Sequence, residues 1–403
     1  MKLLNSFLLM LVMLIISNSA WSQSSLNLTQ QAYRINTITT AVPFLLIAPE
    51  ARGGAMGDAG AATTPDVYSM HYNPAKYAFI ERNVGFSVSY SPWLSQLVND
   101  ISLGYLTGYK KIDDNQTIAG SLRYFSLGNI VFTDNMGYEI SQFSPNEFAI
   151  DAAYSRKFSD YISGAVSLRY IYSNLTGGIF VNGAQSKPGQ SVATDVSFYY
   201  QTDLKAGKTP AVLGIGANIS NIGVKITYTE NQDRSFIPIN LRLGPCLTLN
   251  IDDYNQVLFT FDINKLLVPT PPIYAEDSAG QPIKDVNGNY IIAQGKDPKR
   301  SVVSGMFGSF SDAPGGFREE MQEFSYSVGT EYWYDQQFAL RAGFFYEHPN
   351  KGNRKYITLG AGLRYNVFGL DFSYLVPLEQ RNPLENTLRF TLLFNFDKVK
   401  GTN

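Results

Sequence analysis

Apolar and polar residues alternate one by one near the C-terminal end of the chain. In Leu388–Phe396 every even-numbered residue is Leu or Phe, and the odd-numbered residues are polar except Leu393. Successive side chains of a β-strand point to opposite faces, so this period of two predicts a strand with one apolar face. Its length is about that of a tilted strand that crosses a bilayer.

The same alternation recurs along most of the chain and predicts about fourteen strands, an even number, as bacterial membrane barrels require. The predicted fold is therefore all-β, a transmembrane antiparallel β-barrel. The expected strands are Val84–Tyr90, Ile101–Tyr109, Thr117–Phe125, Phe148–Phe158, Tyr161–Tyr172, Val192–Tyr200, Ala211–Ser220, Ile237–Leu249, Gln256–Ile263, Phe324–Tyr334, Gln337–Tyr346, Tyr356–Tyr365, Val367–Val376 and Thr387–Phe396.

Connection lengths support the same fold independently, because outer-membrane barrels have short periplasmic turns and longer outer loops. If the first strand starts in the periplasm, the even-numbered connections should be short. The short ones are Lys110–Gln116, Ser159–Asp160, Gln201–Pro210, Asn250–Asn255, Asp335–Gln336 and Asn366. The odd-numbered ones are nearly all longer, as in Ser126–Glu147, Ser173–Ser191, Asn221–Phe236 and Asn264–Glu323.

A soluble β-sandwich or propeller also alternates and is the main alternative. The apolar faces here carry Leu, Phe, Val and Tyr more uniformly than a thin sandwich core needs. Their partner faces carry Gly, Ser, Ala and single charges, which is unlike a solvent-exposed face. The membrane barrel is therefore favoured.

The N-terminus is typical of a secretory signal peptide. Met1 and Lys2 precede an apolar run from Phe7 to Ile16 and then small residues, with cleavage expected after Ala20 or Ser22. The expected organisation is a signal peptide at 1–22, an N-terminal lumenal hatch at 23–83, the barrel at 84–396 and a periplasmic tail at 397–403. No later stretch approaches eighteen unbroken apolar residues, so no transmembrane helix is expected.

Composition argues against several functions. The net charge of the 403 residues is −2, so nucleic-acid binding is not indicated. Cys246 is the only cysteine, which excludes an internal disulfide and a Cys-built metal site. The only histidines, His71 and His348, lie far apart in sequence and indicate neither a metal site nor a catalytic triad. We therefore expect no enzyme and no cofactor.

Charged residues recur on the face that points away from lipid. By parity these inward residues are Arg123, Arg169, Arg242, Arg341, Arg364 and Arg389, together with the acids Asp151, Asp195, Asp262, Glu331 and Asp371. One interpretation is a conduction path, since rings of charge line selective pores. The favoured one is a set of lumenal ion pairs that hold the wall and a plug, because both signs are mixed and charge is costly on the lipid side.

The stretch "ARGGAMGDAGAATTPDVYSMHYNPAKYAF", which starts at Ala51, is rich in glycine. It has no Lys after a glycine and no buried strand before it, so a phosphate-binding loop is not indicated. Gly53, Gly54, Gly57 and Gly60 instead allow a segment to fold tightly inside a lumen. A barrel of this size leaves an open channel unless something fills it.

This stretch resembles the N-terminal hatch of FadL-type barrels, and the longer string with "NTITTAVPFLLI" before it resembles the PorV family of the type IX secretion system in Bacteroidota. The resemblance is strongest over residues 36 to 94. Matching hatch positions are Arg52, Gly53, Gly54, Met56, Gly57, Asp58, Asn73, Pro74 and Lys76.

The resemblance implies a non-enzymatic protein that is integral to the outer membrane and surrounded by its lipid. It implies a carrier that associates with the translocon barrel, binds the C-terminal signal domain of secreted cargo and brings it to the attachment complex that contains the sortase. The alternative is a FadL-type channel for uptake of hydrophobic compounds, and a purely structural scaffold is a third possibility.

The longest connection, Asn264–Glu323, is the expected partner-binding loop, since long ordered loops often bind. Its candidate contact residues are Tyr274, Met306, Phe307, Phe310 and Phe317. The four in the Gly-rich "GMFGSFSDAPGGF" segment would otherwise form an exposed apolar patch. A solvated loop with no partner is the alternative.

Overall fold

The computed structural model describes residues 35–93, 100–133, 136–178, 180–181, 184–230, 233–379, 384 and 387–396. The predicted signal peptide, the start of the predicted hatch and the predicted tail at 397–403 lie outside these residues. Asn36–Asn403 belong to one compact unit, which is the part of the chain considered below.

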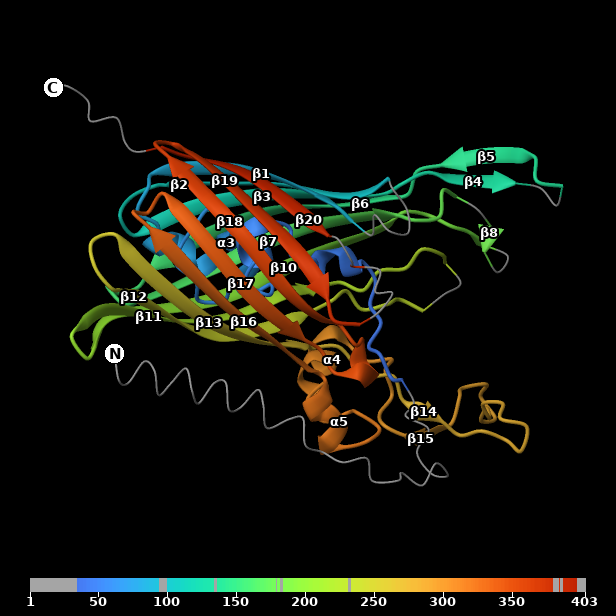
Figure 1. The fold of residues 1–403 in the computed structure, drawn as a ribbon. Coiled ribbons are helices and arrows are strands. Elements are labelled where there is room, and N and C mark those ends of the chain that lie inside the picture. The colour runs from blue at the N-terminus through green and yellow to red at the C-terminus, as the bar shows by residue number, and fades with distance from the viewer. Residues whose placement is uncertain are drawn as a thin grey trace. The chain divides into compact units, whose positions relative to one another are not determined.

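Fourteen antiparallel strands form a closed barrel, which confirms the predicted fold class (Figure 1). Each strand pairs with its neighbours along the chain, and β1 closes the ring by pairing with β20. The wall strands are β1 (Val84–Pro92), β2 (Ile101–Lys111), β3 (Gln116–Leu127), β6 (Asn146–Lys157), β7 (Ile162–Asn174), β10 (Gly189–Ala206), β11 (Thr209–Gly223), β12 (Asn240–Asn250), β13 (Asn255–Leu266), β16 (Phe324–Tyr334), β17 (Phe338–Tyr346), β18 (Lys355–Tyr365), β19 (Phe368–Pro377) and β20 (Leu388–Phe396).

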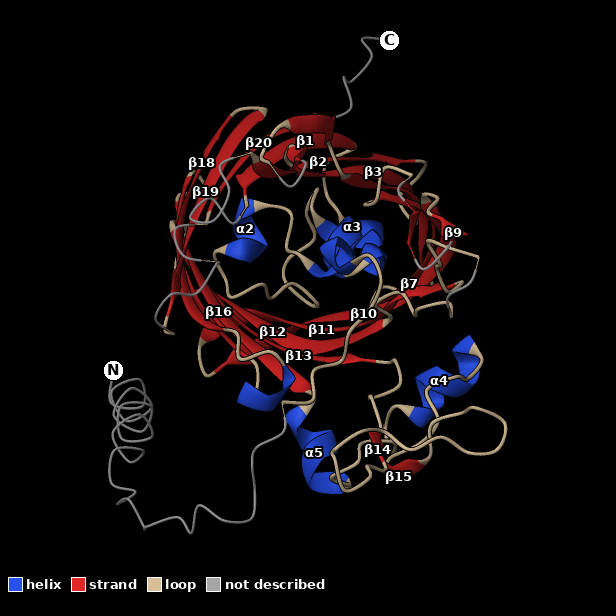
Figure 2. Ribbon diagram, turned by 90° about the vertical axis from the view of Figure 1, so that its right-hand side faces the viewer, coloured by secondary structure: helices blue, strands red, loops and turns tan. Residues whose placement is uncertain are grey.

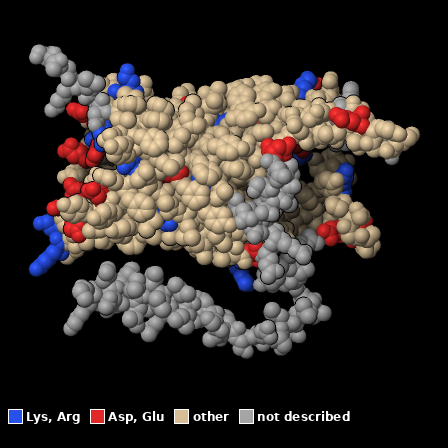
Figure 3. Space-filling view, turned by 45° about the horizontal axis from the view of Figure 1, so that its top comes forward, with Lys and Arg blue, Asp and Glu red and all other residues tan. Residues whose placement is uncertain are grey.

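The alternation of the sequence corresponds to an outer and an inner face. Val166 and Leu392 are 53% and 41% exposed, whereas their neighbours Ser167 and Thr391 are buried. In the space-filling view, charged residues gather at the two ends of the wall and are sparse between them (Figure 3). A closed barrel with such an apolar belt satisfies its backbone hydrogen bonds internally, so the protein is an integral outer-membrane barrel.

Short turns join the strands at one end, which is the periplasmic end of such barrels, and long connections join them at the outer end (Figure 1). Of the wall strands, β10 and β11 extend furthest beyond their predicted bounds, because they continue through the predicted connection Gln201–Pro210 as a hairpin. The described parts of the outer connections contain three small hairpins that the sequence did not predict. They are β4 (Ile130–Thr133) with β5 (Glu139–Phe143), β8 (Phe180–Val181) with β9 (Ala184–Gln185), and β14 (Ile273–Tyr274) with β15 (Ile292–Gln294).

Residues 36–83, here called the inner segment, run through the barrel from the outer end to the start of β1. Asn36 donates its N–H to the carbonyl of Asn350, in an outer connection, at 3.1 Å. The segment contains the short helices η2 (Pro43–Leu46), α2 (Ala51–Gly54), α3 (Ser69–Tyr72) and η3 (Pro74–Phe79). Figure 2 shows α2 and α3 within the ring of strands. Most of the segment is buried and supplies much of the core.

The connection between β13 and β16 also holds two helices, α4 (Val302–Gly308) and α5 (Phe317–Gln322), and η4 (Pro349–Lys351) lies between β17 and β18. Both α4 and α5 lie outside the ring of strands (Figure 2). Among the described residues, no helix is long and apolar enough to cross a membrane.

The lipid-facing belt makes a testable prediction. Val166 projects outward from the middle of β7, so Val166→Arg should destabilise the barrel by about 2–4 kcal/mol, the cost of a cation near the bilayer midplane. Tyr161→Arg, in the short turn before β7, should have little effect because its guanidinium reaches water. Denaturant unfolding in lipid vesicles measures both, and equal losses would contradict the assignment of this face to lipid.

Candidate functional site

The inner segment is fixed by hydrogen bonds that begin at Glu50. Its carboxylate caps α2 by accepting from the N–H groups of Arg52 and Gly53 at 2.6 and 2.7 Å. It also accepts from the hydroxyl of Tyr72 in α3 at 3.0 Å. One buried carboxylate therefore ties two short helices that could not persist alone.

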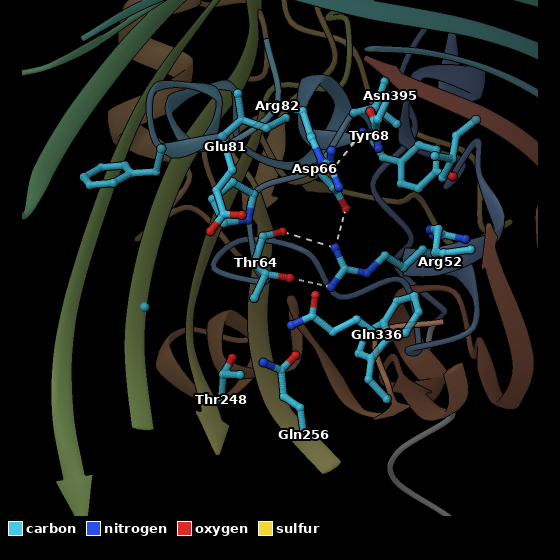
Figure 4. Close-up of a pocket in the computed structure, with 18 of the residues that line it drawn as sticks. Arg52, Thr64, Asp66, Tyr68, Glu81, Arg82, Thr248, Gln256, Gln336 and Asn395 are labelled. Atoms are coloured by element: carbon cyan, nitrogen blue, oxygen red, sulfur yellow. Dashed lines mark hydrogen bonds and ion pairs between the residues drawn. The ribbon is translucent and has the colours of Figure 1, made fainter. Parts of the chain in front are cut away.

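Arg52 uses all five of its N–H donors. Nε and Nη2 bind the two carboxylate oxygens of Glu331 on β16 at 2.9 and 2.6 Å. Nη1 binds Asp66 at 2.6 Å and the Thr64 carbonyl, and Nη2 also binds the Thr64 hydroxyl (Figure 4). This forked, charge-assisted contact joins α2, the turn after it and the wall in one cluster.

The glycines of the predicted hatch motif lie where a side chain would collide. A Cβ on Gly53 would lie 2.2 Å from the Tyr72 hydroxyl, and one on Gly54 would lie 2.6 Å from Arg389 Nη1. Gly57 has φ +69°, and its Cβ would lie 2.5 Å from the backbone oxygen of Phe344. At Gly57 both the conformation and the contact with the wall require glycine.

The other motif residues also reach across to the wall or to one another. Asp58 accepts from the Tyr356 hydroxyl at 2.6 Å, and Met56 is buried against Gly329 of β16. Asn73 donates to the carbonyls of Ala61 and Phe198 and caps η3, whose first residue is Pro74. Lys76 is fully buried, and its Nζ donates to the Thr63 hydroxyl at 2.9 Å.

Three of the six predicted inward arginines bind the inner segment directly. Arg123 donates to the carbonyls of Phe44 and Leu45 at 3.2 and 2.8 Å. Arg242 donates to the carbonyl of Asp58 at 2.8 Å and pairs with Asp262 at 3.3 Å. Arg389 lies 3.6 Å from the Asp58 carboxylate. For Arg123 and Arg242, backbone carbonyls of the inner segment thus take the place of water.

The other three predicted arginines pair with acids of the wall. Arg169 binds Asp151 at 2.5 Å and Asp195 at 3.1 Å. Arg341 and Arg364 share Asp371 at 2.8 and 2.7 Å, and Arg341 also binds Glu331 at 2.6 Å. Asp371 further accepts from the hydroxyl of Tyr68 in the inner segment. Opposite charges alternate in space, so the described residues form no ring of a single sign.

Several residues of the wall that bind the inner segment could not be identified from the sequence motif. Asp262 accepts from the N–H groups of Gly60 and Ala61 at 2.7 and 2.9 Å. Thr358 bridges the Ala55 carbonyl and the Gly57 N–H, both at 2.9 Å. Parity placed Asp262 inward, but its partner could not be inferred from one sequence. For the Glu50 cap the local signal is an acidic residue directly before a helix, where a carboxylate is favoured.

A second cluster of charge fixes the long outer connection to the barrel. Lys265 at the end of β13 binds Glu323 at 2.5 Å and Glu320 at 3.2 Å. Lys351 binds Glu323 at 3.1 Å and Glu319 at 2.6 Å. Although partial burial opposes it, the hydrogen bond from Lys351 lowers the pKa of Glu319. The start and end of this connection are therefore tied to the rim.

The predicted apolar patch of this connection needs one correction. Met306 is buried in a cluster with Leu267 and Val268, so it does not belong to an exposed patch. Val303 and Phe307 lie on a different face of α4 from Met306, and they share that face because positions four apart align on a helix. Phe307 and Phe317 are 76% and 78% exposed.

The other two predicted contact residues of this connection, Phe310 and Tyr274, lie outside α4 and α5. Phe310 is 47% exposed, just after α4. Tyr274 lies in β14, where its ring packs against that of Tyr290 at 5.3 Å. The exposed apolar residues of the helices and of the stretch between them are Val303, Phe307, Phe310, Phe317 and Met321.

The two histidines have structural contacts. His71 Nδ1 lies 2.7 Å from an Arg123 nitrogen, and His348 caps η4 by accepting from the Asn350 N–H. Within the described ranges, no cluster of three His, Cys, Asp or Glu side chains is arranged to hold a metal ion.

The chain matches one sequence family and several solved folds. The sequence model of the family described as "Type IX secretion system protein PorV" matches residues 29–273, more than half of the chain. A search of curated proteins finds no match.

Among solved structures, the toluene transporter TodX of Pseudomonas putida is 12% identical, with 90% of this chain and 99% of that chain covered and a TM-score of 0.47. A FadL homologue of Pseudomonas aeruginosa is also 12% identical, with 90% and 99% covered and a TM-score of 0.40. The toluene transporter TbuX of Ralstonia pickettii is 10% identical, with 87% and 98% covered and a TM-score of 0.44.

The buried ion pairs make a testable prediction. Glu331→Gln removes the carboxylate shared by Arg52 and Arg341, both nearly inaccessible, and leaves their charges unbalanced. We expect a loss of about 3–5 kcal/mol in the free energy of unfolding.

Glu230→Gln is the matched control, because its pair with Lys187 is largely exposed, and no measurable change is expected. Denaturant titration with heat-modifiability on gels measures both variants. If Glu331→Gln unfolds like the control, the ion pairs do not hold the inner segment.

Proposed function

Because the chain belongs to the PorV family of type IX secretion system proteins, we propose that it is the outer-membrane carrier of that system. In this role it binds the C-terminal signal domain of cargo that leaves the translocon barrel and brings it to the attachment complex that contains the sortase. The role requires binding and lateral movement in the membrane but no chemical step.

The observation that carries this proposal is the filled lumen. We infer that the inner segment acts as a plug, because it is buried inside the barrel and bound to the wall on several strands. Asp262, Glu331 and Thr358 hold it to β13, β16 and β18, and Arg123 holds it to β3. An uptake channel for hydrophobic compounds would need an apolar path. Here the lumen is crossed by paired charges and by backbone that Arg123 and Arg242 hold in place. The uptake alternative is therefore disfavoured.

The outer connection between β13 and β16 is the proposed contact surface. Phe307 and Phe317 are more than three-quarters exposed on a surface that the Lys265 and Lys351 clusters hold to the rim. Burial of one such side chain stabilises a complex by about 1.5–3 kcal/mol. Rigid attachment also lowers the entropy that binding would otherwise cost.

Purification in mild detergent from the native outer membrane, followed by mass spectrometry, tests the carrier role. We expect a very large barrel protein or secreted proteins that share a C-terminal domain to co-purify. Recovery of only fatty acids or other hydrophobic small molecules would instead favour the uptake channel.

The contact surface is tested with Phe307→Ser combined with Phe317→Ser in the same purification. The variant should assemble normally yet recover several-fold less cargo or translocon, because its apolar surface is lost. Ile140→Ser is the matched control, since Ile140 is 67% exposed in the separate β4–β5 hairpin. Equal recovery with the double variant and the control would exclude this surface as the contact.

The plug is tested by Gly53→Leu combined with Gly57→Leu. Since both side chains would collide with Tyr72 or with the β17 backbone, the inner segment should be displaced and small antibiotics should enter cells several-fold faster. Gly104→Leu, at an outward position of β2 with no close neighbour, should leave entry unchanged. Unchanged entry for the double variant at normal barrel levels would contradict a plug.

A further inference from the structure

The periplasmic end of the barrel contains a cavity that closure of the lumen does not require. Its volume is about 510 Å³. Its floor is the inner segment at Arg52, Thr64 and Asp66, and its rim includes residues of the short turns such as Gln336 and Asn366 (Figure 4). We call this cavity the vestibule. Its size falls within the range of pockets that enclose ligands.

The buried charged groups at the floor of the vestibule are paired within the protein. All five N–H groups of Arg52 are bonded to Glu331, Asp66 and Thr64. Arg364 donates twice to Asp371 at 3.0 and 2.7 Å. A strongly charged ligand would therefore find the charges of the floor already paired, and the exposed charged residues of the lining are Glu81 and Arg82, one of each sign.

Uncharged amides dominate the polar lining instead. They are Gln201, Asn250, Gln256, Gln336, Asn366 and Asn395. In several of them either the amide oxygen or the amide nitrogen is hydrogen-bonded to another residue of the protein. The Gln201 oxygen accepts from the Tyr199 hydroxyl at 3.0 Å, and the Gln256 nitrogen donates to the Asn250 oxygen at 2.8 Å. Among the described residues the Gln201 and Asn250 NH₂ groups and the Gln256 oxygen have no further side-chain bond, so donors and an acceptor remain for a ligand.

We propose that the vestibule binds a short, uncharged, extended peptide segment of a periplasmic protein. A peptide group carries one N–H donor and one C=O acceptor, which is the set that a carboxamide complements. Phe79, Phe368 and Val212 supply apolar lining for side chains between the amides. This site faces away from the outer surface and does not depend on the proposed carrier role.

The aromatic lining favours a peptide over an oligosaccharide. Sugars commonly need an accessible aromatic face, but Tyr68, Tyr109 and Tyr199 are at most 4% exposed. Trp333 is more accessible, yet the guanidinium of Arg364 lies over its ring at 5.3 Å. Of the half-buried rings, Phe79 has Lys157 Nζ over it at 4.7 Å, and Phe368 packs edge to face with Phe394. The amides are therefore the more available groups.

The test uses the purified full-length protein and two fluorescent probes. One probe is a pool of end-blocked hexapeptides of Ser, Thr, Val and Leu, and the other is a chitin oligosaccharide. We expect saturable anisotropy with the peptide pool. Gln201→Ala combined with Gln256→Ala should weaken it by about tenfold or more, since two hydrogen-bonding groups are lost. Thr248→Trp, which fills the cavity, should abolish it.

Gln190→Ala is the matched control, because this amide lies at the outer end and bonds to Tyr170. It should bind the peptide pool like the wild type, and heat-modifiability on gels confirms that each variant folds. The proposal is overturned if folded wild-type protein binds no peptide, if the alanine variant and the control bind equally, or if the oligosaccharide alone binds.

Discussion

Buried arginine is the constraint on which the interior of this barrel depends. A guanidinium cannot be neutralised at physiological pH, so one that is removed from water must be paired or must bind several acceptors. Arg52, Arg341 and Arg169 are paired with acids, whereas Arg123 binds backbone carbonyls of the inner segment. The wall and the inner segment therefore depend on each other, because each supplies acceptors for buried arginines of the other.

This dependence explains why such short helices persist. Both α2 and α3 have four residues, too few to form a stable helix in isolation. Their ends are bonded by Glu50, Thr358 and Asn218. Gly53 allows α2 to approach Tyr72 closely, and Gly57 allows the turn after α2 to approach β17, so that these groups come within hydrogen-bonding distance. The close approach that the glycines allow is therefore what brings the polar groups of the inner segment and the wall into contact.

The strands could be predicted because their signal is local. One face of each strand contacts lipid and the other faces the lumen, so apolar and polar residues alternate within the sequence of each strand. Leu393, the exception in the last strand, points inward and packs with Tyr68 and Tyr109 in a lumenal cluster. Its partners are far away in sequence, so local alternation could not explain it. The burial of Met306 was missed for the same reason, since its partners Leu267 and Val268 come from the other end of the same long connection.

The two ends of the inner segment lie in different surroundings. At the outer end it meets the cluster of Lys351 and Glu319, where Asn36 donates to the Glu319 carboxylate at 2.9 Å. At the periplasmic end it turns at Thr64 and Asp66 and leaves a polar cavity above the short turns. A segment that served only to close the lumen could fill both ends equally. In the proposed plug, closure depends on the packed stretch around Arg52 and Glu331, so the cavity at the periplasmic end is not required for it.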